Sequence, residues 1–241
     1  MAGHSKFANI RHKKERSDAK RSKIFTKIGR ELAVAVKQGG SNVDMNARLR
    51  DAIAKAKANN MPNDNIERGI KKAAGELGSI NYESVTYEGY GPNAVAIIVK
   101  ALTDNRNRTA ANVRAAFTKG GGNMGQTGSV EYLFKQIGHI AIENTKDINE
   151  DELMDIALEA GAYDFISQKE GYEVITYPNN FTKVVDELKN KYTLLSAEII
   201  MQPLTTVKVT SPEDIKKLNK MMDLLEDDDD VQDVYTNLEE I

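Results

Sequence analysis

The spacing of the apolar residues changes near Gly78, and this change limits what the chain can fold into. Before Gly78 the apolar residues recur every three or four positions, which is the period of an amphipathic helix. After Gly78, short runs of strand character alternate with helical segments and glycine-containing turns. The sequence of 241 residues therefore predicts an α+β protein built from several domains.

Three helices are predicted within residues 1–78. Their apolar stripes are Phe25, Ile28, Leu32 and Val36; Met45, Leu49, Ala52, Ile53 and Ala56; and Ile66, Ile70, Ala73 and Leu77. Gly39-Gly40 and Asn59-Asn60 separate the helices, and Pro62 suits the first turn of the third. Because such helices can bury their stripes only against one another, we expect a three-helix bundle in residues 1–78.

The remaining chain predicts two mixed domains. Residues 137–204 follow the order β-α-β-β-α-β of the ferredoxin-like arrangement, with elements at 138–143, 150–160, 163–168, 172–177, 181–192 and 196–202. The flanking segments predict strands at 84–91, 94–103, 129–134, 205–210 and 231–237, and helices at 107–119 and 212–225. Because residues 205–241 lack a sheet of their own, we expect them to join residues 79–136 in one discontinuous α+β domain. The ferredoxin-like domain is then an insertion in it.

Charge is distributed unevenly along the chain. Residues 1–78 contain 18 Lys and Arg against 8 Asp and Glu, which gives +10, whereas residues 79–241 contain 15 against 28, which gives −13. A basic segment of this kind favours a polyanion as its partner, and the acidic remainder is repelled by that partner. The alternative interpretation is an ordinary charged surface on a helical domain.

The cations are densest in the first predicted helix and in the residues before it. Lys20, Lys23, Lys27 and Arg30 recur at helical spacing on the face away from the apolar stripe, and the segment 20–30 contains no acidic residue. A row of cations spaced about one helical turn apart can follow a phosphodiester backbone. Further candidate contacts are Lys6, Arg11, Lys13, Lys14 and Arg16 before this helix, and Arg48, Arg50, Lys55 and Lys57 on the second. The alternative is a solvated helix face.

Aromatic residues are scarce in the basic segment. Phe7 and Phe25 are the only two in residues 1–78, and the stripe places Phe25 in the core. The segment shows no sharp helix-turn-helix signature either. The sequence therefore predicts contact with the phosphate backbone rather than base stacking or base readout.

Two other segments are candidates for anion binding. Arg106 and Arg108 lie between a predicted strand and a helix N-terminus, where they could grip phosphate. A helix cap formed by Asn107 or Thr109, with incidental charges, explains the same residues equally well. The glycine-rich loop 120–128 runs from helix to strand and lacks the lysine of a P-loop, so it favours a hinge or a backbone contact over a nucleotide site.

Catalysis and metal binding find little support in the sequence. The chain has no cysteine, and His4, His12 and His139 are scattered. Because no nucleophile–base or paired-carboxylate pattern occurs, we expect a protein that is not an enzyme and has no cofactor or small-molecule substrate. The longest apolar run, Ala94–Val99, is far too short for a membrane span, so we expect a cytoplasmic protein.

Long motifs resemble the YebC/PmpR family, which includes the mitochondrial translational activator of cytochrome c oxidase. They are the opening residues 1–14, Lys23–Lys27, Asn60–Arg68, Tyr87–Pro92, Ala101–Thr109 and Gly121–Val130. The resemblance spans essentially the whole chain. It implies an N-terminal helical bundle and an α+β domain interrupted by a ferredoxin-like one. It also implies a cytoplasmic protein described as a probable DNA-binding transcriptional regulator, in a family also implicated in relieving ribosome stalling on proline-rich stretches.

The sequence leaves four functional interpretations to compare. The leading interpretation is a nucleic-acid-binding regulator of gene expression with duplex DNA as its partner, and the alternative is a translation factor that binds ribosomal RNA or the ribosome. An enzyme acting on a phosphorylated ligand would need a catalytic group that the sequence does not show. A protein-interaction module in the acidic ferredoxin-like domain could coexist with either binding role.

Overall fold

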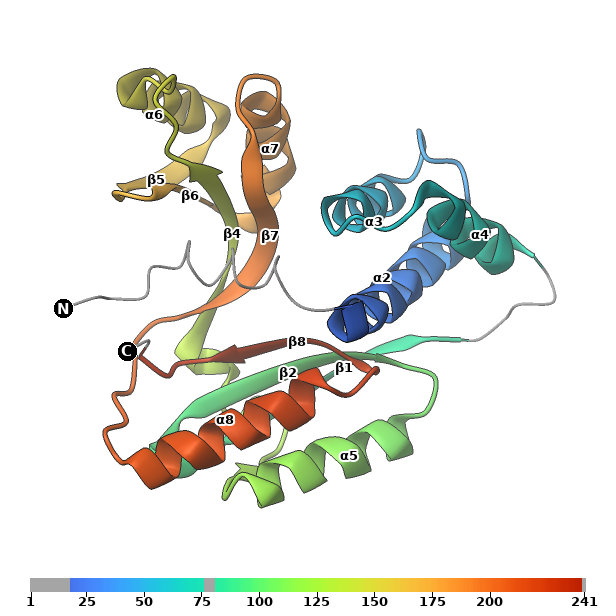
Figure 1. Cartoon of the computed structure of the whole chain (residues 1–241), viewed down its shortest axis with the longest axis vertical. Coiled ribbons are helices and arrows are strands. Elements are labelled where there is room, and N and C mark those ends of the chain that lie inside the picture. The colour runs from blue at the N-terminus through green and yellow to red at the C-terminus, as the bar shows by residue number, and fades with distance from the viewer. Residues whose placement is uncertain (1–17, 76–80, 240–241) are drawn as a thin grey trace. The chain divides into compact units, whose positions relative to one another are not determined.

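The computed structural model describes residues 18–75 and 81–239, with side chains from Ser22 onward (Figure 1). Within these residues the chain forms seven α-helices and two four-stranded antiparallel sheets, which confirms the predicted α+β class. It divides into two compact units. One comprises residues 132–206 with 237–239, and the other comprises 18–75, 81–131 and 207–236. Among the described helices, none is long and apolar enough to cross a bilayer.

The larger unit begins with three helices, α2 (Asp18–Gly39), α3 (Ala47–Ala58) and α4 (Asn63–Ala74). Each predicted helix is present, although Leu77 of the third stripe lies outside the described residues. One core joins all three helices, with Ile28, Leu32, Leu49, Ala56 and Ile66 among its buried members. Phe25, which was expected in that core, is only partly buried and packs against its side.

Met45 is a correction to the second predicted stripe, because its side chain is 83% exposed. It precedes α3, whose N-cap is the next residue, Asn46. The Asn46 side chain accepts a hydrogen bond from the Leu49 backbone N–H at 3.0 Å and donates others to the carbonyls of Ala35 and Gly40. The cap starts the helix after Met45 and leaves that residue in the connecting loop.

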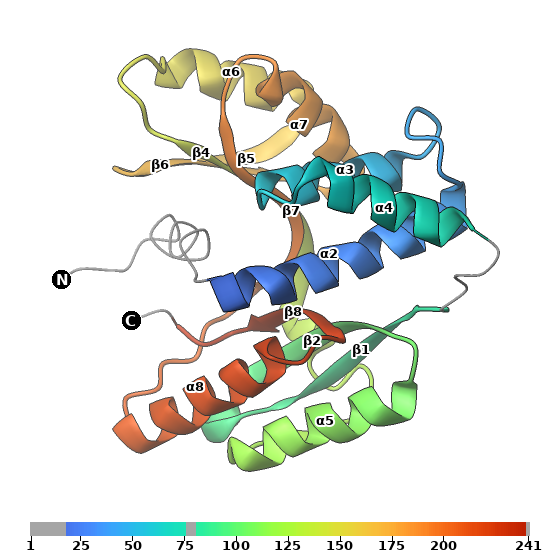
Figure 2. The ribbon, with the colours of Figure 1, turned by 45° about the vertical axis from the view of Figure 1, so that its right-hand side comes forward.

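A sheet in the order β3-β1-β2-β8 forms the rest of this unit. Its main strands are β1 (Glu83–Tyr90), β2 (Ala96–Thr103) and β8 (Val231–Thr236), with the short β3 (Asn123–Met124) beside β1. Helices α5 (Arg106–Lys119) and α8 (Pro212–Glu226) lie side by side against it (Figure 2). The sheet is completed by β8, which supports the prediction that the C-terminal segment pairs with the strands that follow the helices.

Two predicted strands of this region are wrong. Residues 129–134 form a turn with the short 3₁₀ helix η3 (Glu131–Leu133), and extended structure begins only at Phe134. Residues 205–210 contain a single bridge residue and no strand. Val207 and Val209 alternate there as in a strand, but only Val209 is fully buried, so the alternation reflects one anchoring side chain.

The smaller unit has the predicted order β-α-β-β-α-β. It consists of β4 (Phe134–Glu143), α6 (Glu150–Ala160), β5 (Ala162–Ser167), β6 (Gly171–Thr176), α7 (Phe181–Lys189) and β7 (Leu194–Pro203), with the 3₁₀ turn η4 (Pro178–Asn180) before α7. The sheet order is β5-β6-β4-β7. Its core is formed by side chains from the central strands and both helices, such as Ile140, Val174, Leu153 and Leu188.

Candidate nucleic-acid interface

The predicted basic surface falls into described and undescribed parts. Lys6, Arg11, Lys13, Lys14 and Arg16 lie outside the described residues, and Lys20 is placed in α2 by its backbone alone. The rest of the α2 row is Lys23, Lys27 and Arg30. All three side chains reach the segment Glu226–Asp230, which connects α8 to β8 and is called the acidic loop below.

The contacts between α2 and the acidic loop are direct. Lys23 Nζ lies 2.7 Å from the Asp227 carboxylate, and Lys27 Nζ donates to the Glu226 carbonyl oxygen at 2.9 Å. Arg30 is paired with the Asp230 carboxylate and also donates to the Leu102 carbonyl oxygen at 3.0 Å. The three described cations of the α2 row therefore contact the acidic loop, about 200 positions away in the sequence.

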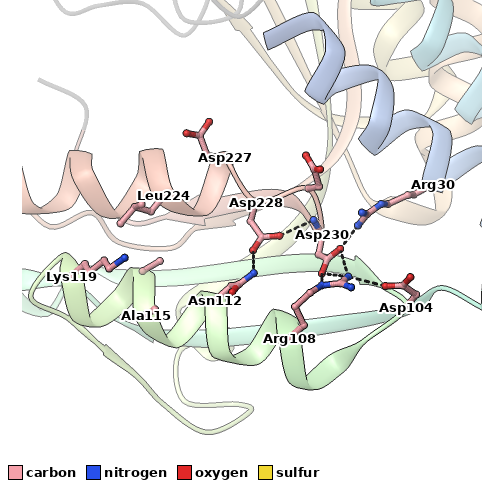
Figure 3. A pocket seen from close by; sticks show the side chains of 12 residues that line it. Arg30, Asp104, Arg108, Asn112, Ala115, Lys119, Leu224, Asp227, Asp228 and Asp230 are labelled. Carbon is pink, nitrogen blue, oxygen red and sulfur yellow. Dashed lines mark hydrogen bonds and ion pairs between the residues drawn. The ribbon is translucent and has the colours of Figure 1, made fainter. Parts of the chain in front are cut away.

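Asp230 is the centre of a buried hydrogen-bonded network (Figure 3). Its side chain is 3% exposed and accepts hydrogen bonds from Arg30 on α2 and from Arg108 and Thr109 on α5. Burial alone would raise the pKa of this carboxyl, but the hydrogen bonds from Thr109, Arg108 and Arg30 outweigh burial and hold the pKa below its ordinary value. The acidic loop is therefore anchored at its last residue.

Arg108 is directed toward this network. Its guanidinium donates to both oxygens of Asp230, at 2.7 and 2.9 Å, and to Asp104 at 2.7 Å. These hydrogen bonds raise the pKa of Arg108. The helix cap proposed as the alternative exists, but Asn105 forms it by accepting the Arg108 backbone N–H at 3.0 Å. Neither Asn107 nor Thr109 is the cap.

Lys27 is a partly buried cation of the α2 row. Burial lowers the pKa of its ammonium group below the ordinary value, although nearby carboxylates, first Glu226 and then Asp233, counteract part of this effect. The ammonium group therefore depends on the acidic loop for compensation of its lost hydration.

The other predicted cations differ in how firmly they are held. Arg48 donates to Gln38, Arg50 donates to loop carbonyl oxygens at 2.7 and 2.8 Å, and Lys55 pairs with Glu31 at 2.7 Å. Lys57 is exposed, and no ion pair to it is seen among the described residues. The Arg106 guanidinium is 64% exposed and lies 3.7 Å from Glu83.

A cavity of about 550 Å³ lies between α5, α8 and the acidic loop. Arg30, Arg108 and Lys119 line it together with Asp104 and four acidic-loop residues, Asp227, Asp228, Asp229 and Asp230. Charges of both signs therefore share one site, in which Asn112 also donates to Asp228 at 2.8 Å. Chemically, this arrangement can exchange a carboxylate for another oxyanion at the cations that line the cavity.

Family models match nearly the whole chain. One described as "TACO1/YebC protein N-terminal domain" matches residues 5–76, and one described as "TACO1/YebC second and third domain" matches residues 82–238. The chain belongs to the TACO1/YebC family. The predicted family resemblance is thereby confirmed.

Two full-length relatives of this TACO1/YebC chain carry the same name. A protein of Clostridium tetani, named "probable transcriptional regulatory protein", is 58% identical over 99% of this chain and 97% of its own length. A protein of Lachnoclostridium phytofermentans with the same name is 56% identical over the full length of both chains. The crystal structure of a conserved hypothetical protein from Aquifex aeolicus is 45% identical, with a TM-score of 0.81 over 92% of this chain and 91% of that one.

The glycine-rich loop of this TACO1/YebC chain surrounds an internal carboxylate. Glu88 on β1 is 1% exposed and accepts the backbone N–H groups of Gly128, Val130 and Glu131 at 2.7 to 2.9 Å. The Gly125 backbone N–H also donates to the Glu88 carbonyl oxygen at 2.8 Å. Because these amides are occupied, this end of the loop is fixed to the sheet and presents no phosphate cradle.

Histidine and acidic side chains of the described residues form no group that could hold a metal ion. His139 Nε2 lies 2.6 Å from Glu173 Oε2, and both side chains are buried in the smaller unit. Gln168 donates to the other Glu173 oxygen at 2.8 Å. His4 and His12 lie outside the described residues.

Sequence reasoning missed Asp230 and Glu88 because each acts on distant residues. Asp230 stands at the end of a run of four aspartates, which is typical of a solvated turn. A signal was nevertheless present in the sequence, because strand β8 begins at the next residue and Asp230 is buried beside it. Glu88 stands within a predicted strand next to Gly89, and no local pattern marks it as a loop anchor.

Proposed function

We propose that this protein is a non-enzymatic, cytoplasmic regulator of gene expression that binds nucleic acid through its N-terminal basic region. The observation that carries the proposal is the charge of +10 on residues 1–78 beside −13 on the remainder. The name of its relatives, probable transcriptional regulatory protein, supports a regulatory role. We propose three domains: 1–78, 79–136 with 205–241, and the inserted ferredoxin-like domain 137–204.

Duplex DNA is the proposed partner, held by its phosphates. The proposed contacts are Lys6, Arg11, Lys13, Lys14, Arg16, Lys20, Lys23, Lys27, Arg30, Arg48, Arg50, Lys55, Lys57, Arg106 and Arg108. The acidic loop supports an exchange mechanism, in which phosphates replace the loop oxygens now bound to Lys23 and Lys27. Lys23 is the easier to exchange, because its pair with Asp227 is 41% and 66% exposed.

Ribosomal RNA is the alternative partner. The described cations of α3 are compatible with it, since Arg50 and Lys55 are held by neighbouring groups rather than presented from the helix as base-reading side chains would be. Contact limited to the phosphate backbone suits the shape-based recognition of structured RNA as well as it suits duplex DNA. Both partners rely on the same cations and differ in the shape that those cations must match.

The salt dependence of binding tests the proposal. Replacing Lys20 and Lys23 by Ala should reduce the slope of log affinity against log salt by up to about 1.8 on duplex DNA, because each lost phosphate contact removes about 0.9. Fluorescence anisotropy between 50 and 200 mM salt measures this slope. The matched control replaces Lys189 and Lys191, two exposed ion-paired lysines of the smaller unit. Equal slopes for the wild type and both variants would contradict the proposal.

A further inference from the structure

A second groove lies between α2 and α4, on residues that the sequence did not mark as a site. Its volume is about 620 Å³. It is lined by Ser22, Phe25, Thr26, Gly29 and Leu32 from α2 and by Met61, Asn65, Arg68, Gly69 and Lys72 from α4 and the turn before it. None of these ten residues is acidic, in contrast to the cavity beside the acidic loop.

The floor of the groove is apolar and partly bare backbone. Leu32 and Met61 are buried beneath it, and the ring of Phe25 is partly exposed beside them. Gly29 stands in the interior of α2, where a Cβ atom would meet nothing within 4 Å, and at Gly69 a Cβ would make only ordinary contact with Leu32. Packing between the helices therefore requires neither glycine.

Glycine weakens a helix relative to alanine, so two helix-interior glycines on one groove call for a reason. Neither has a positive φ angle, and no close approach of another element explains them. The property that they share is the space they leave open above the helix backbone, beside the Phe25 ring. A planar group can enter that space and lie against the ring and the backbone.

The rim of the groove is basic. Arg68 and Lys72 are exposed and stand one helical turn apart on α4. Among the described residues neither one pairs with a carboxylate, whereas their neighbour Lys71 is within 4.0 Å of Glu67. Asn65, one turn before Gly69, adds a side-chain amide that can both donate and accept hydrogen bonds.

We propose that this groove holds an unpaired nucleotide of a nucleic-acid strand, which rests on the proposed nucleic-acid binding. The base lies against Phe25 and the backbone of Gly29 and Gly69, because every base has an apolar face that stacks on an aromatic ring. The phosphates on either side are held by Arg68 and Lys72. An acidic amphipathic peptide would satisfy the same charges, but it would leave the planar opening beside Phe25 unused.

The glycines provide a test that separates binding from folding. Gly29→Ala should raise the urea midpoint of unfolding, because alanine favours the helix and meets no neighbour. The larger Gly29→Leu fills the groove and should weaken binding of a fluorescein-labelled U12 oligonucleotide by at least about tenfold. Replacing both Arg68 and Lys72 by Gln should lower the salt slope on U12 by about 1.4, at about 0.7 per phosphate of a single strand. Lys71→Gln, beside Lys72 but outside the groove, is the matched control and should leave the slope unchanged.

Occupancy of the groove can be followed directly, because the chain contains no tryptophan. Phe25→Trp places a single indole in the groove, and stacking of a base should quench its fluorescence when U12 or dT12 is added. Quenching by either oligonucleotide that Gly29→Leu abolishes supports the proposal. Wild-type affinity for nucleic acid with an unquenched indole and unaffected groove variants would overturn it and leave the proposed function standing. Absence of any nucleic-acid binding by the wild type would overturn both. Quenching by a 12-residue Glu/Leu peptide but by neither oligonucleotide would identify a protein-docking groove and overturn the proposal.

Discussion

Replacing Asp230 by Ala should be among the most destabilising single changes in the larger unit. The side chain is 3% exposed, and its removal leaves Arg30, which is 14% exposed, without its carboxylate. Breaking a buried ion pair on one side costs about 3–5 kcal/mol. The loss of the Arg108 ion pair contributes less to this cost, because the Arg108 side chain is 45% exposed and remains paired with Asp104. We therefore expect a loss of about 3 kcal/mol in the free energy of unfolding.

Urea unfolding of the full chain measures this loss in the free energy of unfolding. Hydrogen exchange at the amides of α5 and β8 provides a second measurement of it. Asp229→Ala is the matched control, because that neighbouring carboxylate is exposed, and its effect should stay within about 0.5 kcal/mol. Lowering the pH should also reduce the free energy of unfolding of the wild type. Because the folded pKa of Asp230 lies below its ordinary value of 3.8, the stabilisation is complete above that pH and is lost as the pH falls through the lower folded pKa. Equal stabilities of the two alanine variants would refute the central role of Asp230.

Three further predictions concern other charged groups. Glu88→Gln should lower the free energy of unfolding by about 3 kcal/mol and speed hydrogen exchange at the amides of the glycine-rich loop. The reason is that a neutral amide cannot accept all three of the hydrogen bonds that these amides donate. An unchanged exchange rate would contradict this prediction. Glu173→Ala should lower the free energy of unfolding, measured in urea, by about 1–3 kcal/mol, because buried His139 loses this hydrogen-bond partner, and a change below about 0.5 kcal/mol would count against that role. Asp227→Asn should tighten duplex-DNA binding in anisotropy titrations by up to about fivefold by freeing Lys23, and weaker binding would refute the exchange mechanism.

Local patterns predicted much of the fold. The helical stripe that includes Ile28 and Leu32 identified α2, and both residues are buried in its core. The order of elements in the smaller unit was also predicted, since strand alternation and helical spacing are each read within a few residues. The prediction failed at residues 205–210, where two valines imitate the period of a strand that the chain does not form.

The candidate site was harder to predict, because long-range pairing determines it. Local spacing showed that Lys23, Lys27 and Arg30 share a face of a helix. It could not show the pairing of Arg30 with Asp230, because these residues lie far apart in the sequence. Ion pairs depend on the folded surface and not on the charge of sequence neighbours. The α2–α4 groove was missed for the same reason, since Gly29 and Gly69 become related only when the two helices pack.

Hydrogen exchange of the full chain, with and without a nucleic-acid partner, tests the central claim most directly. A duplex DNA, purified ribosomes and U12 serve as three separate partners at physiological salt. We expect slower exchange in α2 and α4 with at least one of them, and little change in the acidic unit of residues 132–206. Protection confined to residues 132–206, with α2 and α4 unchanged, would contradict the claim that the basic region binds nucleic acid.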